Sequence, residues 1–507
     1  MKRISIWGMF VSLVFFNACG GTTATTTTAT TTTTDSTTGK TVPGDLVISS
    51  PTATSSASTS ISKRVFWTKA EVGDAAADDF ASKKTALQAL IAGTNDCKFT
   101  MALPSVTSTS CYAPSVNYLG HPDGSPNSGQ MPSGDLAIWN ATQGTQACAA
   151  AKMTELVEKV ASIVDNMVSV FGAVACAGKK ASIALPAIGS SVDLASALST
   201  YVSVTGLTFS AATLERLADS GANPVYKSTL TMSMSFGGAT AQTAKIVLKH
   251  IPTATDNSTY KGKVSMTMNQ AQGEGSNCAG SGASGVTQAG TILYEKTSAT
   301  AMSYEMKFAQ FCGTGKQLDS DNNISLADQL ATSASGWGDN ANYMVASINP
   351  SNGTGTVAYA WQAGQGDDSS RVFNITTTAD ASGNITGTAY AGMGVEIGTT
   401  TDLGKVTKFI CNWAGPGQSH TGIARAQRQE ISKASGATEF TATSSNITFA
   451  PKNDCNASVG DNFTYTSVDG GNPTNDRAAA TSDVTNNLVP LTDFTFTVPT
   501  APTDVGG

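Results

Sequence analysis

Apolar and polar residues alternate along the chain between residues 226 and 465, which is the pattern of antiparallel strands with one dry and one wet face. The clearest runs place apolar side chains at every second position: Leu230, Met232, Met234 and Phe236; Val264, Met266 and Met268; Met302, Tyr304, Met306 and Phe308. Weaker alternation predicts further strands near 342–349, 355–362, 371–378, 385–392, 405–413 and 437–449. Turn signals separate the runs at Gly237-Gly238, Asn352-Gly353 and Ser382-Gly383-Asn384. About ten strands joined by short turns indicate a meander.

One hairpin of this meander can be placed in register from its side chains. With its turn at Thr297–Ala301, Tyr294 lies opposite Tyr304. Ile292 then lies opposite Met306, and all four side chains are on the dry face. A slip of one residue would place dry positions opposite wet ones, so this register is favoured.

The period changes to that of helices in the first part of the chain. Residues 69–92 carry Phe80, Leu87 and Leu90 at helical spacing, which predicts one helix. Residues 146–175 carry a stronger signal, because apolar side chains recur at steps of three and four and form one stripe on a long amphipathic helix. The stripe consists of Met153, Leu156, Val160, Ile163, Met167, Val170 and Val174.

These patterns together predict an α+β fold. A mainly helical part, residues 63–225, is expected to pack on a large antiparallel β-meander, residues 226–470, that forms a twisted sheet or a barrel-like sheet. Residues 471–507 are rich in Asn, Thr and Pro and predict a loop-rich tail with one strand around Phe494–Val498.

The N-terminal end has the three parts of a secretory signal. Lys2 and Arg3 precede an apolar stretch from Ile4 to Phe16, and Ala18 is the small residue before Cys19. Residues 1–20 therefore resemble a bacterial lipoprotein signal, although Phe16 stands where that family usually has leucine. The resemblance implies removal of residues 1–18 and lipid attachment at Cys19. Because Gly20 rather than Asp follows the cysteine, it also implies the outer membrane, with the protein facing the periplasm or the cell surface.

The segment that follows, residues 19–62, is dominated by Thr, Ser, Ala and Gly. Such a composition buries too little apolar surface to offset the entropy of ordering, so a flexible tether is predicted. Its r.m.s. reach would be roughly 35–40 Å.

Nine cysteines minus Cys19 leave eight, an even number that predicts disulfides in an exported chain. The candidates are Cys97, Cys111, Cys148, Cys176, Cys278, Cys312, Cys411 and Cys455. Cys148 and Cys176 would lie roughly 42 Å apart on an unbroken helix, whereas a disulfide needs Cα atoms within about 7 Å.

We therefore favour disulfides that join Cys148 and Cys176 each to Cys97 or Cys111. The pairing of the sequence neighbours Cys97 and Cys111 remains an alternative. The hairpin register brings Cys312 to the hairpin base, beside the glycine-rich loop 272–285 that holds Cys278. A Cys278–Cys312 bridge would leave Cys411 and Cys455 to each other.

Charge and motifs restrict the possible functions. Only 13% of residues are charged, the net charge is −7, and Lys and Arg do not cluster, so nucleic acid is not expected as a partner. The three histidines, His121, His250 and His420, are far apart, and no nucleophile motif accompanies them. We therefore expect neither an enzyme nor a cofactor.

Two further candidate sites remain. Asp319, Asp321, Asn323 and Ser325 have the first ligand spacing of a calcium loop, but Ile324 and Leu330 occupy positions that need Gly and an acid, so this metal candidate is weak. The dry-face methionines Met232, Met234, Met266, Met268, Met302 and Met306 form either a core covered by the 146–175 helix or the wall of a cavity for an apolar ligand.

The function expected from these patterns is a non-enzymatic binding or interaction role at the envelope or cell surface, with the membrane contacted through the N-terminal lipid. Such a protein would present an exposed aromatic patch, for which Trp337, Trp361 and Trp413 are candidates. A carrier of a lipid or other apolar ligand, held behind the methionine strands, is the first alternative. An exported hydrolase is the second.

Overall fold

The computed structural model describes residues 38–53, 80–99, 142–143, 145–204, 206–234, 242–270, 286–312, 340–363, 370–394, 409–410, 422–423, 427–445, 449–456, 462–467 and 498–506. The chain divides into Met1–Asp35 and a compact unit, Ser36–Gly507, to which every described residue belongs.

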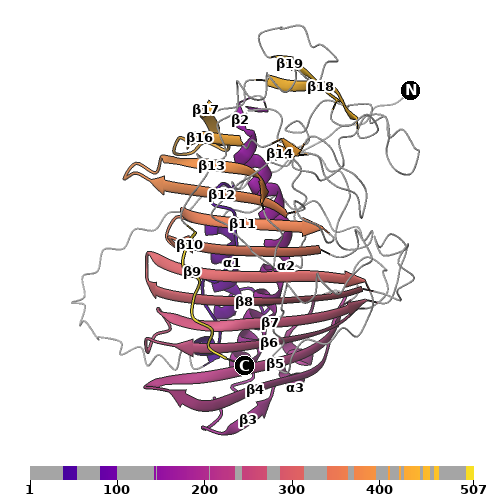
Figure 1. Cartoon of the computed structure of the whole chain (residues 1–507). Coiled ribbons are helices and arrows are strands. Elements are labelled where there is room, and N and C mark those ends of the chain that lie inside the picture. Colours follow the sequence, from indigo (N-terminus) through magenta and orange to yellow (C-terminus); the bar gives the residue numbers. More distant parts are fainter. Residues whose placement is uncertain are drawn as a thin grey trace, which may run out of the picture. The chain divides into compact units, whose positions relative to one another are not determined.

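A large antiparallel sheet, which is not closed, dominates the described residues. Its 15 strands follow the order β1-β2-β17-β16-β13-β12-β11-β10-β9-β8-β7-β6-β5-β4-β3 (Figure 1). The first strands are β1 (Thr142–Gln143), β2 (Gln146–Ala147), β3 (Ser190–Asp193), β4 (Leu207–Ser220), β5 (Asn223–Met234), β6 (Gln242–Pro252), β7 (Tyr260–Gln270) and β8 (Val286–Ser298). The others are β9 (Ala301–Cys312), β10 (Asn340–Ile348), β11 (Gly355–Ala363), β12 (Ser370–Ala379), β13 (Ile385–Gly394), β16 (Gln427–Lys433) and β17 (Thr441–Ser445). Two separate pairs are β14 (Phe409–Ile410) with β15 (Gly422–Ile423), and β18 (Phe449–Asn456) with β19 (Asn462–Ser467).

The meander and the hairpin register are confirmed. From β3 to β13 every strand pairs with the next one along the chain. In the β8–β9 hairpin Tyr294 is opposite Tyr304, and Ile292 is opposite Met306. Cys312 is opposite Val286, at the hairpin base.

The boundary between the helical and β-rich parts is placed wrongly at 225/226 by the sequence patterns. β1, β2, β3 and β4 lie inside residues 63–225, and the consecutive strands of the meander begin at Ser190. The apolar and polar residues of β4 alternate irregularly, and many of them are exposed because its outer neighbour, the edge strand β3, is only four residues long. β16 was also not predicted from the sequence, whereas the predicted strand at 437–449 includes β17.

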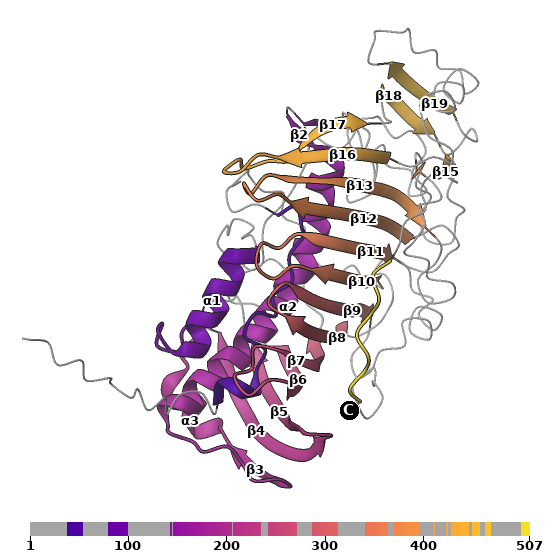
Figure 2. The same cartoon turned by 90° about the vertical axis from the view of Figure 1, so that its left-hand side faces the viewer.

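The described helices lie on one face of the sheet (Figures 1 and 2). They are η1 (Thr38–Thr41), α1 (Phe80–Ala92), α2 (Cys148–Lys180) and α3 (Ala195–Tyr201). α2 crosses the strands, and its 33 residues extend over roughly 50 Å at about 1.5 Å per residue. Because strands are spaced about 4.8 Å apart, one such helix covers roughly ten of them. At its first turn the Ala149 N–H donates to the Gln429 side chain of β16, at 2.8 Å.

α2 is buried on more than the single stripe that its sequence predicts. The seven stripe residues are buried, and so are Val157, Val164 and Phe171 between them. The long helix and its buried stripe are confirmed, but the opposite side of α2 does not face water, because α1 and an N-terminal segment cover it. Within the described residues Val160–Lys180 is also long and apolar enough to cross a membrane, but most of it is buried, as in the core helix of a soluble domain.

That N-terminal segment, residues 38–53, is here called the N-terminal strap. Val42, Leu46, Val47 and Ile48 are at most 3% exposed and belong to the main apolar core. The expectation of a flexible tether over 19–62 is therefore wrong for 38–53. A short apolar cluster is enough to dock the strap, and it was hidden by the Thr-rich average composition of the longer segment.

One disulfide is seen among the described residues, between Cys97 and Cys176. Their Cα atoms are 5.5 Å apart and they are separated by 79 residues in the sequence. This is one of the cross-pairings that the sequence favours, and it is incompatible with the alternative Cys97–Cys111. Cys148 is also disulfide-bonded, whereas Cys111, Cys278 and Cys411 lie outside the described residues.

We expect Leu46→Ala to lower the free energy of unfolding by about 2–5 kcal/mol, because Leu46 is 0% exposed and the truncation leaves a cavity. Ile188→Ala is the control, since Ile188 is 62% exposed and its truncation should change stability by about 0.5 kcal/mol or less. Chemical denaturation of both variants measures the difference. Equal stabilities would contradict the docking of the strap.

Candidate functional site

A buried polar cluster joins β6, β7 and β8 where the strap meets the sheet. His250 of β6 is opposite Gly262 of β7, which is opposite Tyr294 of β8. A Cβ atom at position 262 would clash with the Tyr294 hydroxyl and with the carbonyl oxygen of Lys249. Glycine therefore lets the Tyr294 side chain cross β7 and reach His250 Nδ1, at 2.9 Å.

Asn257 fixes the proton position on His250. Its amide nitrogen donates to the carbonyl oxygens of Gly39 (3.1 Å) and Val42 (2.8 Å) in the strap. Its amide oxygen lies 2.9 Å from His250 Nε2, which must therefore carry the proton. Nδ1 then accepts from the Tyr294 hydroxyl. Burial lowers the pKa of His250 to about 4, so the ring is neutral at pH 7.

Asp45 of the strap brings a charge into this region. The Tyr260 hydroxyl donates to one carboxylate oxygen, and Lys296 Nζ lies 2.6 Å from the other. Both charged side chains are nearly buried, at 8% exposure for Asp45 and 12% for Lys296. Burial, together with the Asp45 charge, raises the pKa of Tyr260 well above its ordinary value. These contacts fasten the strap to β7 and β8.

A second buried cluster joins α1 to α2. Lys83 Nζ lies 2.5 Å from Glu158 Oε2 and 2.9 Å from Asp165 Oδ2. Burial alone would lower the pKa of Lys83, but Asp165 and Glu158 outweigh that effect, so the pKa lies above its ordinary value. Burial raises the pKa of Asp165 to about 6, against the lowering effect of Lys83.

The strap supplies the remaining partners of these ions. Ser49 Oγ and the Ser50 N–H each donate to Glu158 Oε1 at 2.9 Å. The Ile48 N–H donates to Asp165 Oδ1 at 2.8 Å, and Lys83 donates to the Ile48 carbonyl oxygen at 2.8 Å. The strap thus runs along α2, and both polar clusters hold it in place. Because their ionisable groups are engaged with partners inside the protein, we assign them a structural role.

We expect acid to weaken the fold through His250. Its folded pKa is lowered from 6.5 to about 4, so its contribution to stability is complete above about pH 6.5 and is lost as the pH falls through 4. The stability difference between the wild type and His250→Gln should therefore shrink by on the order of 3 kcal/mol between pH 7 and pH 3.5. Urea denaturation at several pH values measures it.

Asp165 acts in the opposite direction between about pH 4 and 6, because its pKa is raised. It is present in both proteins, so the difference isolates His250. A difference that stays constant with pH would contradict the neutral, buried state of the ring.

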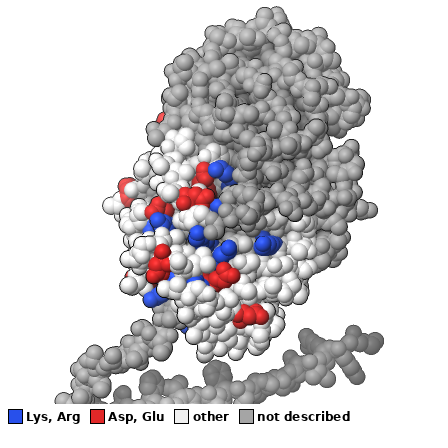
Figure 3. Space-filling view, turned by 60° about the horizontal axis from the view of Figure 1, so that its bottom comes forward, with Lys and Arg blue, Asp and Glu red and all other residues white. Residues whose placement is uncertain are grey.

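The outer face of the sheet, opposite the helices, carries a group of lysines. β5, β6 and β7 contain no Asp or Glu, and their lysines all occupy the positions that alternate with the buried apolar residues. This group, called the lysine face below, consists of Lys227, Lys245, Lys249, Lys261 and Lys263. Figure 3 shows basic side chains interspersed with acidic ones on the described part of this surface.

Three of these lysines form a row across the strands. Lys227 is opposite Lys249, and Lys249 is opposite Lys263. Like charges directly opposite each other destabilise a sheet. Glu215 of β4, opposite Lys227, stands at one end of the row.

The C-terminal segment, residues 498–506, lies on this outer face (Figure 2). Lys249 Nζ donates to the Val505 carbonyl oxygen at 2.7 Å, and Lys263 Nζ lies 3.1 Å from Asp504 Oδ2. The Lys263 side chain is only 3% exposed, whereas that of Asp504 is 49% exposed. Lys227, Lys245 and Lys261 form no ion pair in the part of the chain that the structure describes.

The six candidate methionines are confirmed on the dry face. All are at most 2% exposed and share one apolar core with side chains of α2. Trp361 also packs against this core and is partly buried, so it is not part of an exposed aromatic patch. The other candidates lie outside the described residues: Cys19, His121, Asp319, Asp321, Asn323, Ser325, Trp337, Trp413 and His420.

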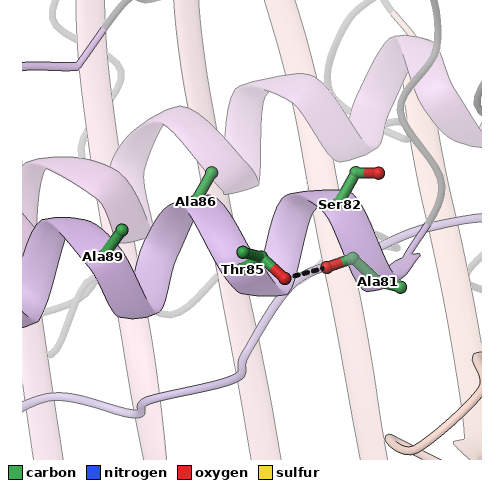
Figure 4. Close-up of a pocket in the computed structure, with 5 residues that line it drawn as sticks. All are labelled: Ala81, Ser82, Thr85, Ala86 and Ala89. Atoms are coloured by element: carbon green, nitrogen blue, oxygen red, sulfur yellow. Dashed lines mark hydrogen bonds between the residues drawn. The ribbon is translucent and has the colours of Figure 1, made fainter. Parts of the chain in front are cut away.

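A shallow depression lies on the outer side of α1 (Figure 4). Its lining consists of Ala81, Ser82, Thr85, Ala86 and Ala89. The Thr85 hydroxyl donates to the Ala81 carbonyl oxygen at 2.8 Å, within the helix. These five residues carry no charge, so they provide no acid, base or metal ligand. Among the described residues there is also no cluster of three or more His, Cys, Asp or Glu suited to a metal ion.

Sequence patterns missed the lysine face, because the alternating runs that predict strands do not include residues 242–252, which form β6 and hold Lys245 and Lys249. The five residues are spread over 37 positions, from 227 to 263, and only the pairing of β5, β6 and β7 brings them together. The conclusion that Lys and Arg do not cluster is therefore wrong for the folded chain. The available signal was the scarcity of acids, since Asp256 is the single acidic residue between Asp219 and Glu274 in the sequence.

Known proteins add nothing to this description. No family model, no curated protein and no solved structure matches the chain.

Proposed function

We propose that this protein is a lipid-anchored envelope or cell-surface protein that binds a partner, without catalysis, through the lysine face. The observation that carries the proposal is the concentration of five lysines and no acid on three adjacent strands of a chain with net charge −7. A group of positive charges on a protein of negative net charge favours a negatively charged partner and increases the rate at which the two meet.

The arrangement of the rest of the fold supports the choice of the outer face. The helical part packs on the other face of the sheet, where α1, α2 and the strap share one core with the strands. On the outer face Lys245 is exposed, and Lys227 and Lys261 are partly exposed.

Cys19 is the proposed anchor, and Gly20 supports an outer-membrane location. Residues 20–37 separate the anchor from the strap, and a chain of this length reaches at most roughly 60–65 Å. Because the strap is fastened to β7 and β8 through Asp45, the lysine face is held close to its point of attachment.

A carrier of a lipid or other apolar ligand is the second candidate function. The six adaptable methionine side chains on the helix-facing side support it. Because these methionines pack against α2 in a shared core, we favour the carrier role less than binding of a partner at the outer face. Native mass spectrometry would detect a co-purifying lipid if the carrier role is correct.

We expect the triple variant Lys227→Gln, Lys245→Gln, Lys261→Gln to bind isolated envelopes at least about tenfold more weakly than the wild type, because three free charges are lost. Co-sedimentation of protein carrying Cys19→Ala, so that the lipid does not contribute, measures binding. Salt should weaken binding of the wild type, since exposed charges are screened within about 8 Å at physiological ionic strength.

The matched control is Lys98→Gln, Lys179→Gln, Lys433→Gln, which removes the same charge away from the lysine face. It should bind envelopes as the wild type does. Equal losses in both triple variants would indicate a net-charge effect and would sink the proposed site.

We also expect Cys19→Ala to release the protein from membranes of the producing cells, because a lipid chain contributes about 0.8 kcal/mol per buried CH₂. Fractionation followed by mass spectrometry of the N-terminal peptide measures this. An unacylated N-terminus downstream of residue 19 in the wild type would refute the anchor.

A further inference from the structure

The C-terminal segment shows what kind of group the lysine face accepts. Two adjacent residues contact two adjacent strands: the carbonyl oxygen of Val505 accepts from Lys249, and the carboxylate of Asp504 pairs with Lys263. Both groups are oxygen acceptors carried by an extended peptide that crosses the strands (Figures 1 and 2).

We propose that the lysine face recognises an acidic, extended peptide segment of a partner protein, and that the C-terminal segment occupies part of this site in cis. The proposal rests on the proposed function, for which it names the chemistry of the partner.

The spacing of the lysines fits such a segment. Strands about 4.8 Å apart place Lys227 and Lys263 roughly 10 Å apart, with Lys249 between them. An extended peptide advances about 3.3 Å per residue, so its alternate side chains lie roughly 7 Å apart on one face. Acidic residues at alternate positions therefore present carboxylates within reach of Lys227 and, once the C-terminal segment is displaced, of Lys249 and Lys263.

The cis occupant leaves much of the site free. Asp504 is the single acid among residues 498–506, and its side chain remains half exposed. Lys227, Lys245 and Lys261 keep no ion pair within the described residues. A segment with several acids makes more contacts than the cis occupant, and it can displace the C-terminal segment although the latter benefits from being attached to the same chain.

The C-terminal segment should therefore act as a competitor. A fluorescent peptide of alternating Asp and Ala is the probe, titrated against the full chain by anisotropy at low salt and at physiological salt. We expect Asp504→Asn to tighten binding about three- to tenfold, because the contact with Lys263 is lost. A variant ending at residue 497 should tighten it at least as much.

The triple variant of Lys227, Lys245 and Lys261 should bind the peptide at least about tenfold more weakly, whereas the control triple variant of Lys98, Lys179 and Lys433 should bind normally. Melting temperatures equal to the wild type show that each variant folds. The Asp504→Asn variant keeps the whole chain and so provides the test if the truncated variant does not fold.

Two outcomes would overturn the proposal while sparing the proposed function. Affinities of the wild type and Asp504→Asn within twofold would exclude competition in cis. Binding to vesicles containing phosphatidylglycerol but not to the acidic peptide would identify a membrane surface as the partner of the lysine face. If the lysine variants alter neither peptide nor envelope binding, both proposals fail.

Discussion

An open sheet with a wide apolar face must be covered, and this requirement determines most of the described structure. α2 provides the cover as a single helix of roughly 50 Å that crosses about ten strands. α2 also has a side that does not face the sheet. Val157, Val164 and Phe171 would be exposed to water if nothing covered that side. α1 and the strap cover this side, so that α2 is enclosed between the sheet and a third layer of chain.

Enclosing α2 also buries its charges. Glu158 is fully buried and Asp165 nearly so, and buried carboxylates need hydrogen-bond partners as well as an opposite charge. Lys83 of α1 supplies the charge, and the strap supplies N–H and hydroxyl donors. The polar contacts therefore determine where the strap lies, while its apolar side chains complete the core. In this way the segment nearest to the proposed anchor becomes part of the folded domain.

Local patterns predicted the features that depend on local rules. Alternation gave the meander and the β8–β9 register, because a slip of one residue would have exposed Tyr294 and Tyr304. Composition predicted a flexible tether where the strap is folded, because the Thr-rich average of residues 19–62 outweighs the few apolar residues around Leu46. The polar clusters could not be foreseen, because Asp45 meets Tyr260 and Lys296 over 215 and 251 residues of sequence. The lysine face needed the strand register for the same reason.

The strand register places three like charges, Lys227, Lys249 and Lys263, opposite one another, which is unfavourable for the local stability of the sheet. Opposed like charges are unfavourable in a sheet, and neighbouring outer positions such as Thr229, Thr231 and Thr267 show that uncharged residues fit the same surface. Natural sequences carry such conflicts chiefly at functional sites. The helix-facing side carries no comparable conflict, because the described charges there are paired. Within the protein this repulsion is relieved in part, because Asp504 pairs with Lys263 and Glu215 lies opposite Lys227, so acceptors from the chain itself already approach the row.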